Sequence, residues 1–136
     1  KEELEKKNKD LRGELFRYKG DELLRNSIHI NNTPFITKVF DDTDLKEINV
    51  IANHLNNICD SVQAYGSKYE NKGQFLISAS KDLNINLKDI LKEISEEFEI
   101  KGGGSSQTVQ GGCSLEDLDK LLNKFLERIK NSISLN

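Results

Sequence analysis

The sequence predicts an α/β (α+β) fold, in which a small mixed β-sheet is covered by helices and preceded by a long N-terminal helix. Two observations predict this class. Apolar residues recur at helical spacing in some segments and fill short strand-like runs in others, and the two kinds of segment alternate along the chain. The 136 residues suffice to bury one modest core, so we expect one α/β domain at residues 28–136 and an appended helix at residues 1–27.

Residues 1–27 are rich in Lys and Glu and predict one long helix, which Gly13 and Gly20 weaken. An apolar stripe near heptad spacing runs along it and consists of Leu4, Leu11, Leu15 and Tyr18. A solvated helix with one apolar seam usually buries that seam against a partner. Two partners remain open, the body of the domain and a second copy of the helix, and the second would make residues 1–27 an oligomerisation arm.

Short apolar runs rich in β-branched and aromatic residues predict the strands of the sheet. Residues 28–30 and 35–40 flank a turn that contains the only proline. Residues 61–65 and 74–80 are expected to form a hairpin around residues 70–73.

Side chains that favour helix N-termini precede each of the later helices. Asp44, with Glu47 three residues on, precedes one apolar helical pattern, and Asn86 precedes the next. The last helix is expected to start at Ser114, whose spacing to Asp117 resembles a capping box. Its core face is predicted to consist of Leu118, Leu122, Phe125 and Ile129.

A Gly-rich loop is predicted at residues 101–112, where residues 102–112 hold five of the nine glycines and no charged residue. Glycine lets a ligand approach the backbone amides closely, and the run ends at the positive end of the last helix dipole. These features predict a cradle for a phosphate or a ribose. The alternative is a flexible linker, but amide and hydroxyl side chains at fixed positions argue against a spacer.

The last helix carries a basic ridge, in which Lys120, Lys124 and Arg128 recur every four residues. Together with the predicted cradle, this ridge is a candidate contact for the phosphates of a nucleic acid. The alternative interpretation is a solvated face paired with Glu116 and Glu127. A net charge of −3 excludes a global basic field, so any RNA contact has to come from a local patch. The complete candidate set is Lys101, Gly102, Gly103, Gly104, Ser105, Gln107, Thr108, Gln110, Gly111, Gly112, Lys120, Lys124 and Arg128.

The segment from Lys101 to Gly112 resembles the signature of the DHH-associated domain, type one, at the C-terminus of alanyl-tRNA synthetases and their freestanding editing relatives. Seven positions match that signature in register: Lys101, Gly102, Gly103, Gly104, Gln110, Gly111 and Gly112. Ser105 and Ser106 replace an Arg-Pro pair, and Cys113 replaces a glycine. The lost arginine removes an expected phosphate or ribose contact.

The resemblance implies a domain that binds tRNA and forms a homodimer through its N-terminal helix. It also implies that upstream domains of a parent protein carry the aminoacylation or editing of alanyl-tRNA and use zinc, or ATP with magnesium. Two alternatives remain open: the substrate-binding domain of a DHH phosphoesterase, and a purely structural dimerisation domain. The absence of methionine, even at position 1, indicates a piece excised from a longer protein.

The residues predict no catalytic or metal site, and therefore no cofactor, within this chain. His29 and His54 lack the spacing of zinc ligands, and the three aspartates of residues 41–44 are expected to cap a helix. Cys113 would be reactive if the helix lowered its pKa, but packing is the preferred interpretation. The two unpaired cysteines and the lack of a long apolar run predict a cytoplasmic protein without a membrane segment.

Overall fold

The computed structural model describes residues 2–30 and 32–134, with side chains described for residues 11, 13–30 and 32–133. A single mixed sheet of six strands has the order β1-β2-β3-β4-β6-β5, and only β2 and β3 pair in parallel. The predicted fold class is therefore confirmed. The elements are α1 (Glu2–Arg25), β1 (Ile28–Ile30), β2 (Thr33–Asp41), α2 (Leu45–Asn56), β3 (Val62–Tyr69), β4 (Lys72–Ala79), η1 (Lys81–Leu83), α3 (Leu87–Ser95), β5 (Lys101–Gly104), β6 (Thr108–Cys113) and α4 (Leu118–Ser134).

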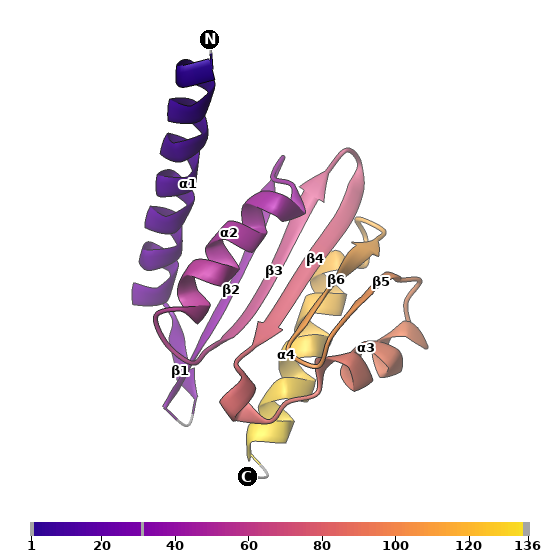
Figure 1. Cartoon of the computed structure of the whole chain (residues 1–136). Helices are drawn as coiled ribbons and strands as arrows, with labels where there is room; N and C mark the ends of the chain where they lie inside the picture. The colour runs from indigo at the N-terminus through magenta and orange to yellow at the C-terminus, as the bar shows by residue number, and fades with distance from the viewer. Residues whose placement is uncertain (1, 31, 135–136) are drawn as a thin grey trace.

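Helices lie on both faces of the sheet, with α1 and α2 on one side and α3 and α4 on the other (Figure 1). Because strand side chains alternate between faces, β4 contributes to both cores. Leu76 packs in the cluster with α1 and α2, whereas Phe75 and Ile77 pack in the cluster with α3 and α4. We call these two sides of the sheet the α2 face and the α4 face.

The helix cover of the α2 face stops before the last two strands. Figure 1 shows α2 in front of β2 and β3, while no described helix lies in front of β6 and β5. Burial follows this arrangement, since Val109 on the α4 face is fully buried and its neighbour Gln110 on the α2 face is exposed. The α2 face of β6 and β5 therefore exposes glycine backbone and polar side chains to solvent.

A buried polar pair fixes α2 on the sheet. The Tyr65 hydroxyl donates to Gln63 Oε1 at 2.7 Å, and Gln63 Nε2 donates to the Ala52 carbonyl of α2 at 3.2 Å. Burial raises the pKa of Tyr65 far above its ordinary value, so the hydroxyl remains a donor at neutral pH. The hydrogen bond to the Ala52 carbonyl therefore holds α2 in one position on β3.

Local signals at the helix and hairpin ends are largely confirmed. Asp44 Oδ1 accepts the Glu47 N–H at 3.0 Å, Asn86 Oδ1 accepts the Asp89 N–H at 3.3 Å, and β3 and β4 form the predicted hairpin. The predicted start of the last helix at Ser114 is wrong, because α4 begins at Leu118. The Ser114 carbonyl instead accepts the Asp117 N–H at 3.2 Å, which makes a separate turn before the helix.

The N-terminal helix packs on α2 through a stripe that the heptad pattern does not predict. Phe16 is buried there, Leu23 and Leu24 pack against the same cluster, and Asp21 Oδ1 lies 2.7 Å from His54 Nε2 of α2. The two helices are in contact at Gly20, where a Cβ would lie 3.4 Å from Ile51 Cγ2, which is ordinary van der Waals distance. The body of the domain therefore covers this stripe and not the predicted seam.

The predicted seam lies on the opposite side of α1, since residues of an α-helix follow one another by about 100°. Leu11, Leu15 and Tyr18 expose 61%, 51% and 62% of their surface, and the Leu4 side chain lies outside the described residues. The domain body thus leaves this part of the seam uncovered.

Candidate nucleic-acid interface

The glycine-rich run forms a β-hairpin, which corrects the prediction of a loop. Lys101 to Gly104 form β5, Thr108 to Cys113 form β6, and β6 also pairs with β4. Glycine has a low strand propensity, but β4 offers a paired edge that supplies the hydrogen bonds of a ladder. The predicted place of the run, at an edge of the sheet, is confirmed.

The turn of this hairpin is held by five hydrogen bonds, three within the turn and two to neighbouring segments. The Ser105 N–H donates to the Thr108 carbonyl at 2.8 Å, and Ser105 Oγ accepts the N–H groups of Gln107 and Thr108, each at 3.2 Å. The Ser106 carbonyl accepts the Leu87 N–H, and the Gln107 carbonyl accepts the Ala79 N–H, each at 2.9 Å. A segment held in this way is a fold element, so the linker alternative is wrong.

The glycines of the hairpin divide into two groups. A Cβ at Gly111 would lie 2.5 Å from the Lys101 carbonyl oxygen, and Gly104 has a φ of 153° that other residues rarely adopt. A Cβ at Gly103, in contrast, would meet no described atom within 4 Å. At position 104 the backbone conformation disfavours other residues, and at position 111 a Cβ would clash with the backbone of β5. At position 103 a side chain would fit, so the glycine there leaves open space above the sheet.

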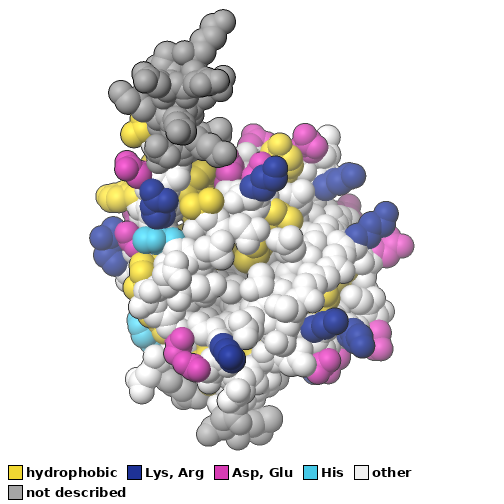
Figure 2. Space-filling view, in the orientation of Figure 1, with side chains coloured by type: hydrophobic (Ala, Val, Ile, Leu, Met, Phe, Trp, Pro, Cys, Tyr) yellow, Lys and Arg dark blue, Asp and Glu magenta, His cyan; other side chains and the backbone are white. Residues whose placement is uncertain are grey.

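The uncovered part of the α2 face is called the open face here, and it is formed by Lys101, Gly103, Thr108, Gln110 and Gly112. Asn49 of α2 reaches its border, where Asn49 Nδ2 donates to Gln110 Oε1 at 3.3 Å. Figure 2 views this side of the molecule and shows mostly backbone and uncharged groups across its middle, with both basic and acidic side chains around the margin. The open face is therefore largely uncharged in the centre and carries a positive charge at Lys101.

The basic ridge of α4 faces the other way. Lys124 Nζ lies 3.7 Å from Glu97 Oε2, and Arg128 NH1 lies 3.5 Å from Glu93 Oε2 of α3. These partners come from α3 and from the turn that follows it, instead of the expected Glu116 and Glu127. Since α4 packs on the α4 face, the ridge and the open face lie on opposite sides of the sheet.

We predict that charge reversal at Lys124 and Arg128 has a small effect. Both ion pairs are about half exposed, so the double variant should lose no more than about 1 kcal/mol of unfolding free energy. If the chain binds tRNA, as the family resemblance implies, the double variant should bind it about as tightly as the wild type does. Urea unfolding and a tRNA titration check the two statements, and a marked loss of affinity would return the ridge to the candidate interface.

Cys113 is a packing residue in this structure. It is partly buried against the core of the α4 face, and burial, followed by the negative charge of Asp117, raises its pKa to about 11. The alternative of a lowered pKa is therefore wrong, and the group is a neutral thiol at pH 7.

Among the residues that the structure describes, no cluster of three or more His, Cys, Asp or Glu is arranged to hold a metal ion. No helix in the same part of the chain is long and apolar enough to cross a membrane.

Three polar residues near the open face were not among the sequence-predicted contacts: Asn49, Lys72 and Gln74. In β4, Lys72 and Gln74 alternate with Gly73 and Phe75. Because successive side chains of a strand point to opposite faces of the sheet, this alternation already places Lys72 and Gln74 on the same face. The missing information was that β4 pairs with β6, which places them beside the glycines.

Comparison with known proteins identifies a domain family that matches this chain and two related proteins. The sequence profile of the DHHA1 domain matches residues 32–131. An alanine–tRNA ligase from Natranaerobius thermophilus is 27% identical over 135 residues, which cover 96% of this chain and 15% of the ligase. The alanyl-tRNA editing protein AlaX-L from Pyrococcus horikoshii is 22% identical over 135 residues, which cover 97% of this chain and 31% of that protein. The chain thus spans less than a third of either relative.

The solved structures agree with this architecture. The C-Ala domain of Aquifex aeolicus alanyl-tRNA synthetase superposes with a TM-score of 0.63 at 24% sequence identity. The match covers 76% of this chain and 96% of that domain. At this level of identity, the likeness shows a shared fold.

Proposed function

Because the chain belongs to the DHHA1 domain family, we propose that it binds tRNA as one part of a protein that acts on alanyl-tRNA. The names of its two relatives, an alanine–tRNA ligase and an alanyl-tRNA editing protein, support this assignment. In this proposal the ligation or editing reaction belongs to other domains of the parent protein, which use zinc, or ATP with magnesium.

The observation that carries the proposal is the open face. RNA presents phosphates, ribose hydroxyls and base edges, and a surface without Cβ atoms lets them approach the strand backbone. Thr108 and Gln110 add hydrogen-bonding groups, and Lys101 adds a positive charge at the edge. The hairpin is already ordered by its own hydrogen bonds, so binding costs little conformational entropy.

Ser105 has a different role from the arginine that it replaces in the family signature. Its hydroxyl accepts two N–H groups of the turn and holds the hairpin closed. We therefore assign RNA contact to Lys101, Gln110 and the surface over Gly103, and assign a structural role to Ser105.

A titration of labelled tRNA at low salt tests this function with the variant Lys101→Glu. Loss of one phosphate contact should weaken binding by roughly three- to tenfold and make the salt dependence shallower by about one unit. Lys88→Glu is the matched control, because this exposed lysine of α3 undergoes the same charge change away from the open face. Equal binding by the wild type and both variants would contradict the proposal.

A second copy of this chain is the partner that we propose for the exposed seam of α1. Leu11, Leu15 and Tyr18 form one apolar line on the side of α1 that faces away from α2. Apolar seams of this spacing bury themselves in helix pairs. The homodimer leaves the open face free, because α1 and the hairpin lie at opposite edges of the sheet (Figure 1).

A further inference from the structure

The side of α2 that borders the open face carries a row of asparagines. Asn49, Asn53 and Asn56 recur at spacings of four and three residues, so they share one side of the helix. This side touches the sheet at both ends, through Asn49 on Gln110 of β6 and through Asn56 on Ser78 of β4. We call Asn49, Asn53 and Asn56 the amide stripe.

The first contact of the stripe pairs two amide groups. Asn49 Nδ2 donates to Gln110 Oε1 at 3.3 Å, which leaves Asn49 Oδ1 and Gln110 Nε2 without a hydrogen bond to another described residue. Gln110 is an exposed residue, and Asn49 Oδ1 is open to solvent. Either orientation of the two amides leaves one free donor beside one free acceptor.

A glycine keeps the approach to this amide pair open. Gly103 of β5 lies opposite Gln110 of β6, and a Cβ at Gly103 would meet no described atom within 4 Å. A flat molecule can therefore lie over Gly103 with its edge toward Gln110 and Asn49. Nucleobases have this shape, and their edges carry donors next to acceptors, which the amides of Asn and Gln can bind in pairs.

The other end of the stripe is held in place from inside the domain. Asn56 Oδ1 accepts from Gln63 Nε2 at 3.1 Å, and Asn56 Nδ2 donates to Ser78 Oγ at 3.2 Å. Gln63 is fully buried, so these bonds fix the exposed Asn56 amide, which keeps one N–H for a ligand. Asn56 also lines a cavity of about 260 Å³ together with Gln107 and Thr108 of the hairpin. The stripe thus ends at a polar cavity between α2 and the hairpin.

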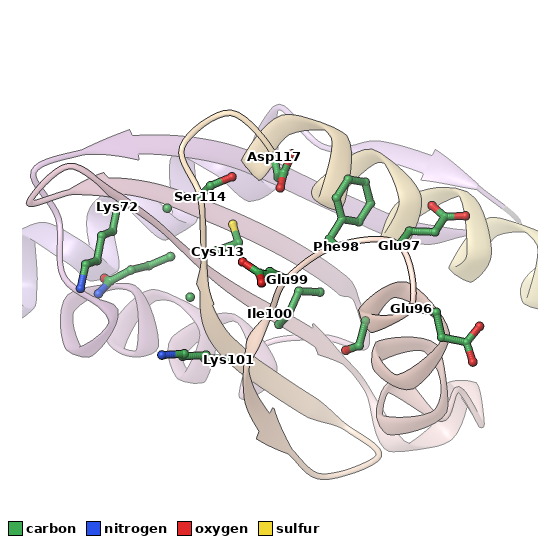
Figure 3. Close-up of a pocket in the computed structure, with 14 residues that line it drawn as sticks. Lys72, Glu96, Glu97, Phe98, Glu99, Ile100, Lys101, Cys113, Ser114 and Asp117 are labelled. Carbon is green, nitrogen blue, oxygen red and sulfur yellow. The ribbon is translucent and has the colours of Figure 1, made fainter.

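Charge restricts where an RNA strand can run from Lys101. A second cavity, of about 950 Å³, lies at the start of β5 and is lined by Glu96, Glu97, Glu99 and Asp117 (Figure 3). Figure 3 shows Lys101 pointing away from Glu96 and Glu97. Because carboxylates repel phosphates, a strand that contacts Lys101 is directed over the open face toward α2.

We propose that the amide stripe and Gln110 read unpaired bases of the bound RNA, with one base over Gly103 and the phosphates toward Lys101. The inference rests on the proposed function, which it deepens by naming the base contacts. The amides are uncharged, so they distinguish one RNA from another, whereas Lys101 attracts any phosphate.

Titrations of tRNA and of a blunt RNA duplex at several salt concentrations test the stripe, because the duplex offers phosphates but no unpaired base. Asn49→Ala and Asn53→Ala should each weaken tRNA binding by about three- to tenfold, through loss of a hydrogen bond to a base. Duplex affinity and the salt dependence should stay unchanged. Lys101→Glu should instead weaken both RNAs and make the salt dependence of both shallower.

Two features make the asparagine variants informative. The Asn53 side chain forms no hydrogen bond with another described residue and alanine favours a helix, so Asn53→Ala should not lower the melting temperature. Asn123→Ala is the matched control, because it makes the same substitution at an exposed position of α4, on the other side of the sheet. It should bind both RNAs as the wild type does.

Asparagine variants that bind tRNA as tightly as the wild type would overturn the base-reading stripe and leave the proposed function standing. Equal losses of tRNA and duplex affinity, with a shallower salt dependence, would also overturn it, because the contacts would then be to phosphates. A wild type that does not bind tRNA at low salt would overturn the proposed function, and the stripe with it.

Discussion

Replacing Gly111 with alanine is expected to destabilise the domain by about 1 to 3 kcal/mol. The added Cβ would lie 2.5 Å from the Lys101 carbonyl oxygen and 2.7 Å from the Gly102 Cα, and both are backbone atoms of the paired strand. Relief of the clash requires β5 to move away from β6, which breaks ladder hydrogen bonds. Urea unfolding measured by circular dichroism gives the free energy directly.

Gly103→Ala is the matched control for this prediction. It adds the same methyl group to the same hairpin, but into open space, so its unfolding free energy should stay within about 0.5 kcal/mol of the wild type. Equal effects of the two substitutions would contradict the division of the glycines into a structural and an open group.

The double substitution Leu11→Asp with Leu15→Asp is expected to convert the proposed homodimer into a monomer. Both side chains lie on the exposed seam of α1, and aspartates facing each other across a helix pair are strongly unfavourable. The fold of the monomer should persist, because Phe16 and Leu23 pack α1 on α2 from the opposite side. Sedimentation velocity over a range of concentrations measures the change.

Arg17→Asp is the control for this experiment, since it changes the net charge by the same two units at an exposed position of α1 outside the seam. It should sediment as the wild type does. A wild-type chain that is monomeric at high concentration would rule out the homodimer.

The sequence predicted those parts of the fold that depend on neighbouring residues. The caps at Asp44 and Asn86 and the hairpin of β3 and β4 follow from short-range spacing, and all three are present. The body of the domain was one of the two partners left open for the N-terminal helix, but the stripe by which α1 packs on α2 was not predicted. Phe16, Leu23 and Leu24 lie off the heptad seam, and only the tertiary structure shows that this stripe is the one that α2 covers.

The candidate site was predicted in part. The predicted place of the glycine run at an edge of the sheet is confirmed, but its strands depend on the pairing of β4 with β6, which joins residues about thirty to forty positions apart. The same pairing brings Lys72 and Gln74 to the interface. The acidic partners of Lys124 and Arg128 lie on α3 and in the turn after it, so the charge pattern of α4 alone did not reveal them.

Binding of tRNA by the variant Gly103→Glu tests the central claim most directly. The substitution places a negative side chain in the middle of the open face, at a position where a Cβ meets no described atom, so the fold should be retained. If RNA lies on this face, the variant should lose roughly tenfold or more in tRNA affinity at low salt, while Gly103→Ala retains most of it. A folded Gly103→Glu protein that binds tRNA as tightly as the wild type would show that RNA does not contact the open face.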